Sequence, residues 1–123
     1  MRVTGLGLVA IGLLSAAAGP VAPGEGELVA QATTFGAVAM QANTCGLRDA
    51  DWAEDLRLFA LQQHADHGQL VAALGYGDME AAEDLAADTP EVVCRQLKAN
   101  PALQQADEAV KAYRKARPGR PVG

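Results

Sequence analysis

The two cysteines, Cys45 and Cys94, are the residues of this sequence whose type and spacing point most directly to a chemistry. An even number of cysteines in an exported chain favours a disulfide, whereas a Cys-His nucleophile would need one of them to stay unpaired. A bridge between them closes a loop of about 50 residues, which in the chain-entropy model stabilises the fold by at most roughly 4 kcal/mol. We therefore predict a Cys45–Cys94 disulfide.

Other catalytic groups are scarce in this sequence. Ser15 is the only serine, and it lies in a segment that we expect to be removed, so the mature chain has no serine for a Ser-His-Asp site. No C-x-x-C motif is present, which excludes a thioredoxin-like redox site and a c-type haem attachment. Gly75-Tyr76-Gly77 is too short for a phosphate-binding loop and no strand precedes it. We predict no catalytic residue and no cofactor, hence a protein that is not an enzyme.

Two histidines and a group of carboxylates are the remaining candidates for ligand chemistry. His64 and His67 are three residues apart, a spacing that puts both imidazoles near one face of a helix, as metal sites do. Two ligands do not make a site, however, and histidines near a helix C-terminus are also favoured there when charged. Asp84, Asp88 and Glu91 lack the EF-hand pattern. We predict no metal site, while carboxylate pairs for glycoside cleavage stay open.

The charges are unevenly distributed along the chain. Between Asp49 and Glu91 there are eleven acids and a single base, Arg57. After Glu108 the charged residues are all basic, namely Lys111, Arg114, Lys115, Arg117 and Arg120. Without the first 18 residues, 9 Lys+Arg stand against 15 Asp+Glu, a net charge of −6, which opposes nucleic-acid binding. The basic end is either a solvated helix terminus or a segment that contacts the acidic body or an anionic surface.

The first eighteen residues are typical of a secretory signal peptide. A basic start, Met1-Arg2, is followed by an apolar run around Leu6–Leu14 and by the small residues 15–18. The apolar run is shorter than the ~20 residues that a membrane span needs. We predict cleavage after Ala18, with a second possible cut after Ala32, and a mature protein in the periplasm or secreted. The alternative is that the first segment is a buried helix.

The remaining chain is predicted to be all-α, a small bundle of four to six helices with one disulfide. Expected helices span Glu27–Asn43, Asp49–His67, Gln69–Asp88 with a kink or break at Gly75-Tyr76-Gly77, and the segments after Thr89-Pro90 and Asn100-Pro101. Residues 19–26 are expected to be a flexible start, 27–117 the helical domain and 118–123 a flexible tail. Alanine is the commonest residue, so each helix buries little apolar area and the disulfide has a clear use.

The predicted helix Asp49–His67 has an unusually wide apolar surface. Its main stripe is formed by Trp52, Leu56, Phe59, Ala60 and Gln63, whereas Leu58 and Leu61 fall on the far side. The helix is therefore either central, touching several neighbours, or it has an exposed apolar patch. The residues expected to contact a client or a partner are Trp52, Leu58, Phe59 and Leu61.

Short motifs around the cysteines resemble the HdeA/HdeB-type periplasmic acid-stress chaperones. Thr44-Cys45 is followed about fifty residues later by T-P-x-V-V-C, Thr89 to Cys94, and then by Lys98-Ala99-Asn100-Pro101. The resemblance covers roughly 43–101, and it departs where an aromatic or leucine is expected close after the first cysteine. It implies a small disulfide-bonded helical protein that is dimeric near neutral pH, loosens in acid and holds unfolding client proteins.

Two functions follow as expectations. The first is a periplasmic holdase: in acid the carboxylates are protonated, and nine Lys/Arg with two histidines give about +11, so like-charge repulsion loosens the fold. The second is an envelope accessory or interaction protein of unknown partner without catalytic activity. Protection of a client at low pH distinguishes the two. Expected partners are therefore unfolding clients, an envelope protein or a second copy.

Overall fold

Five α-helices make up the part of the chain that the computed structural model describes, residues 24–117. They are α2 (Glu25–Thr44), α3 (Ala50–Leu61), α4 (His67–Ala87), α5 (Pro90–Lys98) and α6 (Pro101–Ala116). The all-α class, the number of helices and the disulfide are thus as the sequence predicted. The expected signal peptide 1–18, the residues 19–23 of the expected flexible start and the tail 118–123 lie outside the described residues.

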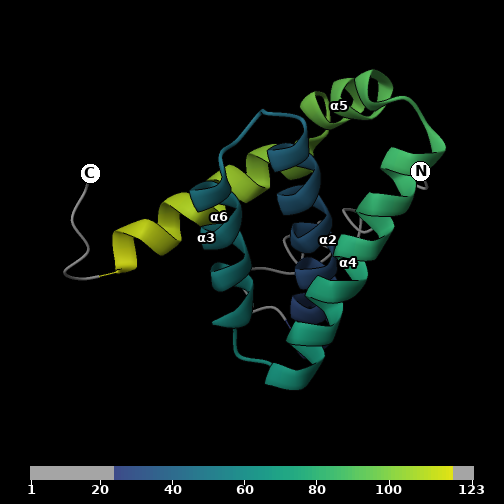
Figure 1. Ribbon diagram of the computed structural model, residues 1–123. Coiled ribbons are helices and arrows are strands. Elements are labelled where there is room, and N and C mark those ends of the chain that lie inside the picture. The colour runs from purple at the N-terminus through teal and green to yellow at the C-terminus, as the bar shows by residue number, and fades with distance from the viewer. Residues whose placement is uncertain (1–23, 118–123) are drawn as a thin grey trace.

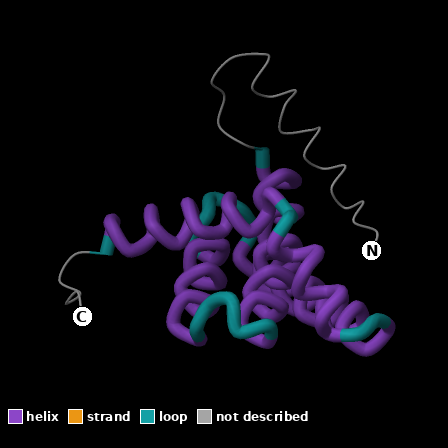
Figure 2. Tube along the Cα trace, turned by 90° about the horizontal axis from the view of Figure 1, so that it is seen from above, coloured by secondary structure: helices purple, strands orange, loops and turns teal. Residues whose placement is uncertain are grey.

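Helix α2 is the centre of the arrangement and contacts each of the other described helices. It packs most extensively along α4, while α3 lies on its other side and α5 lies near its C-terminal end (Figure 1). Helix α6 crosses both α2 and α3, and in the view from above it runs along one side of the remaining helices (Figure 2). The bundle therefore has a layer of three neighbouring helices with α6 laid across it.

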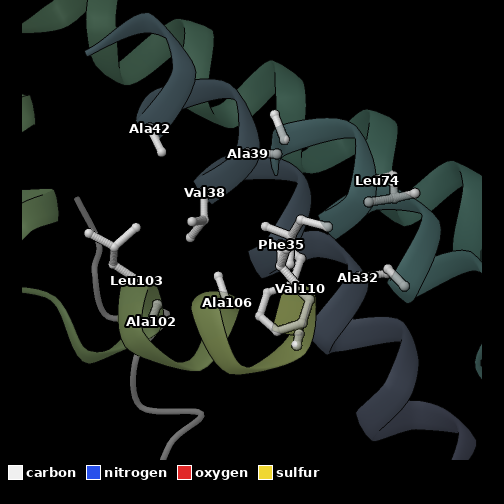
Figure 3. Close-up of a cluster of buried hydrophobic side chains, with 14 of the residues drawn as sticks. Ala32, Phe35, Val38, Ala39, Ala42, Leu74, Ala102, Leu103, Ala106 and Val110 are labelled. Carbon is white, nitrogen blue, oxygen red and sulfur yellow. The ribbon is translucent and has the colours of Figure 1, made fainter. Parts of the chain in front are cut away.

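The core between α2 and α6 is built mostly from small side chains. On α2 the buried residues in this region are Ala32, Phe35, Val38, Ala39 and Ala42, and on α6 they are Ala102, Leu103, Ala106 and Val110 (Figure 3). Alanines let two helices approach closely but remove little apolar area from water, so this packing is correspondingly weak per residue.

The helix starts follow the capping signals of the sequence. The side chain of Asp49 accepts a hydrogen bond from the Trp52 backbone N–H (2.8 Å), and that of Asn100 accepts one from the Ala102 N–H (2.9 Å). Pro90 and Pro101 occupy first-turn positions, where a missing N–H costs no hydrogen bond. The two late helices therefore begin where the sequence predicted.

The predicted helix Asp49–His67 is wrong at its C-terminal end. Helix α3 ends at Leu61, and α4 begins at His67. The side chain of Asp66 caps the new helix by accepting the Gln69 N–H (3.0 Å), and the Asp66 N–H donates to Glu25 Oε2 (2.7 Å). Gly68, which was interpreted as a helix stop, lies in the first turn of α4 because an aspartate cap two residues earlier starts a helix there.

Of the kink or break predicted at Gly75-Tyr76-Gly77, the break is wrong, because α4 is continuous from His67 to Ala87. The second glycine serves packing instead. A Cβ added at Gly77 would meet the Thr33 carbonyl oxygen and lie 2.8 Å from Ala37 N, while one at Gly36 would lie 2.5 Å from the Leu74 oxygen. Two glycines from opposite helices thus allow the close crossing of α2 and α4.

The disulfide connects the C-terminal end of α2 to α5, as predicted. Cys45 and Cys94 are bonded, with a Cα–Cα distance of 5.6 Å. Gly46 follows with a φ of +71°, a left-handed conformation that glycine adopts without steric cost, and the Leu47 N–H donates to the Ala42 oxygen (2.9 Å). The left-handed turn ends α2 at the position where the chain must reach its bridge. Within residues 24–117, no helix combines the length and apolar character needed to cross a membrane.

Candidate functional site

Helix α6 is attached to the start of α3 by an ion pair between Arg48 and Asp107. Arg48 donates from Nε to Asp107 Oδ1 (2.9 Å) and from Nη2 to Oδ2 (2.6 Å), the fork geometry that a guanidinium and a carboxylate favour. Trp52 Nε1 donates to the same Oδ1 (2.9 Å), and the Arg48 guanidinium lies 5.6 Å from the Trp52 ring centroid. A single carboxylate on α6 therefore binds one side chain of the loop before α3 and one of α3 itself.

These contacts lower the pKa of the Asp107 carboxyl. The largest cause is the hydrogen bonding from Arg48, to which the charge of Arg48, the Trp52 indole N–H and the charge of Lys111 add, while burial opposes the shift. The same pair raises the pKa of Arg48, chiefly through the hydrogen bonds to Asp107. Asp107 therefore favours the folded state when ionised, and that contribution is lost only as the pH falls through its lowered pKa.

A second carboxylate, Asp55 of α3, binds the C-terminal end of α6. Its side chain is only 4% exposed. Arg114 Nε donates to Asp55 Oδ2 (2.7 Å), and Arg117 Nη1 lies 3.5 Å from Oδ1. The Arg117 guanidinium also lies over the Tyr113 ring, 5.0 Å from its centroid. The basic end of the chain thus contacts the acidic body, which is one of the two interpretations that the sequence left open.

These two carboxylate sites and their partners are here called the α6 clamp; its members are Arg48, Trp52, Asp55, Asp107, Arg114 and Arg117. The apolar face of α6 packs against α2 and α3 on both sides of Asp107. Sequence reasoning missed the clamp because each pair is 55 residues or more apart in the chain. One signal was present: Asp55 lies within the buried helical face of Trp52 and Leu56, where a carboxylate needs a partner.

The predicted contact residues of α3 are only partly accessible. Trp52 is 7% exposed and takes part in the clamp. Phe59 and Leu61 are half-buried and pack against the core, with the Phe59 ring 6.1 Å from that of Phe35. Leu58 is half-buried as well. Helix α3 is thus mainly a central helix in the folded state, the first of the two interpretations of its wide apolar surface.

Exposed large apolar side chains lie on α4 instead. Val71 is 49% exposed, Tyr76 is 54% exposed and Met79 is 57% exposed, and together they are the exposed large hydrophobic residues among 24–117. Sequence reasoning placed Leu70, Leu74, Ala81 and Leu85 in the helical register of this segment and did not examine the opposite face. Helix α4 packs on α2 through one face only, so the opposite face has no neighbour within the described part of the chain.

The histidines and acids that were considered as ligands are not brought together. His64 lies in the loop after α3 and His67 begins α4, so they do not share the helix that the sequence predicted. Asp84 and Asp88 line a small hollow of about 40 Å³ between α2, α4 and α5, which holds roughly one water molecule. No group of three or more potential metal ligands occurs within residues 24–117.

Comparison with known proteins returned no match: no family model, no curated protein and no solved structure is similar to this chain.

Proposed function

We propose that this chain is an exported protein that holds unfolding client proteins in acid, and that α6 is the element whose release exposes the client-binding surface. One observation carries the proposal: two carboxylates, Asp107 and Asp55, attach the middle and the C-terminal end of α6 to α3 and the loop before it. The short motifs around Cys45 and Cys94, which resemble those of HdeA/HdeB-type chaperones, support the same class of function.

Acid acts on both attachments of α6, and because the pKa of Asp107 is lowered, its carboxylate is neutralised at a lower pH than an ordinary carboxyl. Carboxyl groups ordinarily titrate near pH 4, so at about pH 2.5 most of them are neutral while every arginine stays charged. The carboxylate of Asp107 faces Arg48 from the loop, the Trp52 N–H from α3 and Lys111 from α6. After protonation the three cations of the clamp, Arg48, Arg114 and Arg117, no longer face negative partners, and they repel one another and the other bases of the chain.

Release of α6 would expose apolar surface that is otherwise buried. The side chains that α6 covers on α2 include Val38 and Ala42, and its own contributions include Leu103 and Val110 (Figure 3). The disulfide precedes α6 in the chain and ties α5 to the end of α2. Because that bond does not titrate, α6 opens as a tethered arm and the remainder stays compact, a state of the molten-globule type.

The test compares two paired variants during acid titration. Asp55→Asn with Asp107→Asn should bind an apolar dye and lose near-ultraviolet circular dichroism at a higher pH than the wild type. Glu54→Gln with Glu108→Gln removes two exposed carboxylates outside the clamp and serves as the control. The wild type at about pH 2.5 should suppress aggregation of an acid-labile client near equal molar ratio. Unchanged spectra down to that pH, with client aggregation as in buffer, would contradict the proposal.

A second function, an interaction protein of the cell envelope, is favoured by a different observation. The exposed apolar side chains of α4 lie on the folded molecule and need no acid to become accessible. Exposed apolar groups that gather on one face of a helix commonly mark a contact surface. This function predicts binding of a partner at neutral pH, where the holdase is closed, so the two proposals are tested under different conditions.

A further inference from the structure

We propose that the outer face of α4 binds a basic amphipathic helix of a partner protein. The α4 outer face is defined by six exposed residues, Val71, Ala72, Gly75, Tyr76, Met79 and Ala82. The proposal rests on the interaction-protein function and is independent of the acid-dependent holdase.

The residues of this face share one side of the helix. Val71, Gly75, Met79 and Ala82 follow one another at spacings of three and four, and at these spacings side chains lie above one another on an α-helix. The opposite side of α4, which includes Leu70 and Leu74, is buried against α2. Figure 1 shows α4 at the edge of the bundle, with α2 on one side of it only. The face is thus apolar, continuous and available to a helix from outside.

Gly75 has no role in the packing of the described chain. A Cβ at this position would have no atom within 4 Å, in contrast to Gly77 on the inner side, where a Cβ would meet the α2 backbone. A glycine in the middle of a helix destabilises it relative to alanine. On the proposed surface, the missing side chain of Gly75 would let the backbone of a partner helix come close to α4. Gly77 allows the same close approach to α2 on the inner side.

The charges around the face indicate a basic partner. From Leu58 to Cys94 the sequence has seven acids and no lysine or arginine, and of these acids Asp78 of α4 pairs with Arg57 of α3 (3.3 Å). Glu80 and Glu83 are exposed on the same helix, beside Met79. A ligand with apolar side chains on one side and lysines or arginines along its edges would fill the apolar strip and pair with these carboxylates. An anionic membrane surface is disfavoured by the same charges.

A second copy of this chain fits the face less well than a single foreign helix. Two α4 helices would bring two acidic surfaces together, and the exposed bases of α6, such as Lys111 and Lys115, are not accompanied by exposed large apolar residues in the described part of the chain. The exposed large apolar residues of the described chain are confined to this one helix, whereas a standard protein–protein interface takes ~800 Å² from each partner. A strip confined to one helix suits a single helix laid along α4.

The experiment measures binding of a fluorescent 18-residue Leu/Lys amphipathic peptide at pH 7 by anisotropy. Val71→Asn with Met79→Gln should weaken binding at least about tenfold, and Glu80→Lys with Glu83→Lys should do the same, equivalent to about 1.4 kcal/mol or more. The matched control is Glu54→Lys with Glu108→Lys, which makes the same change of net charge on α3 and α6 and should alter binding less than twofold. A scrambled peptide of equal composition should bind weakly. Circular dichroism verifies that each variant is folded.

Each other outcome overturns the proposal in a distinguishable way. Equal weakening by the control charge reversals means that net charge alone attracts the peptide. Cross-links from the bound peptide to residues outside α4 would be compatible with an interaction protein, but they would reject the α4 outer face as its binding surface. Self-association in sedimentation that Met79→Gln abolishes identifies a second copy as the occupant. No binding of the peptide by the wild type at pH 7 rejects both the surface and the basic partner, whereas the acid titration tests the holdase separately.

Discussion

The close crossing of α2 and α4 leads to a prediction in which two neighbouring glycines respond in opposite directions to the same substitution. Gly75→Ala places a methyl group in open space, whereas Gly77→Ala places it against backbone atoms of Thr33 and Ala37. Both substitutions improve helix propensity equally, because both positions lie inside α4. The difference between them therefore isolates the contact with α2.

The magnitudes follow from these contacts. Gly75→Ala should stabilise the fold by about 0.5–1 kcal/mol, since nothing opposes the gain in propensity. At Gly77 the neighbouring atoms belong to a helix backbone and cannot move away as a flexible side chain would. Overpacking of this kind costs about 1–3 kcal/mol or more, so the net effect of Gly77→Ala should be a loss of roughly 1–2 kcal/mol.

Thermal and urea unfolding at pH 7, followed by far-ultraviolet circular dichroism, give the measurement. For a domain of this size a change of 1 kcal/mol shifts the Tm by about 4–8 °C. The Tm of Gly75→Ala should rise by a few degrees, and that of Gly77→Ala should fall by roughly 5–15 °C. The difference between the Tm values of the two variants is the result that tests the close crossing. If both variants become more stable to the same extent, the close crossing does not exist and the reasoning is refuted.

Three further predictions concern the α6 clamp and the disulfide. Asp107→Asn should lower the free energy of unfolding at pH 7 by about 1 kcal/mol, a value reduced because the side chain is partly exposed. Because the pKa of Asp107 is lowered in the fold, the difference from wild type should persist above about pH 5 and vanish in stronger acid. A loss of stability that does not depend on pH would contradict this. Asp55→Asn should cost about 2 kcal/mol in urea unfolding, since its carboxylate is buried, and a neutral effect would count against its role. The free energy of unfolding of the Cys45→Ala, Cys94→Ala variant should be lower by up to about 4 kcal/mol. Wild-type stability in this variant would show that the disulfide does not stabilise the fold.

The parts of the fold that the sequence predicted are those with local chemical signals. Asp49, Thr89-Pro90 and Asn100-Pro101 mark helix starts through capping oxygens and proline at the first turn, and the structure places helices there. The two errors both involve glycine. Gly68 and the pair around Tyr76 were interpreted as interruptions because a glycine that permits a turn and a glycine that admits a neighbouring helix look the same in a single sequence.

The candidate site was largely beyond local reasoning. Pairs such as Arg48–Asp107 join residues far apart in the chain, and their formation depends on the crossing of α6 over α3, which no periodicity specifies. The position of Asp55 on a buried helical face was readable and shows that a charged residue within an apolar stripe deserves a search for its partner. The α4 outer face could have been predicted by identifying the apolar residues of α4 that do not belong to its buried face.

Under the proposed export, the single disulfide also has a consequence for the way in which the chain matures. Cys45 meets its partner only after α3, α4 and the first turns of α5 have emerged from the translocation machinery, by which time α2 and α4 are both present to pack together. With two cysteines in the sequence only one pairing within the chain exists, so no scrambled isomer can trap it. Maturation therefore calls for an oxidant but not for an isomerase, and its yield should depend on the oxidising power of the compartment rather than on the rate of disulfide reshuffling.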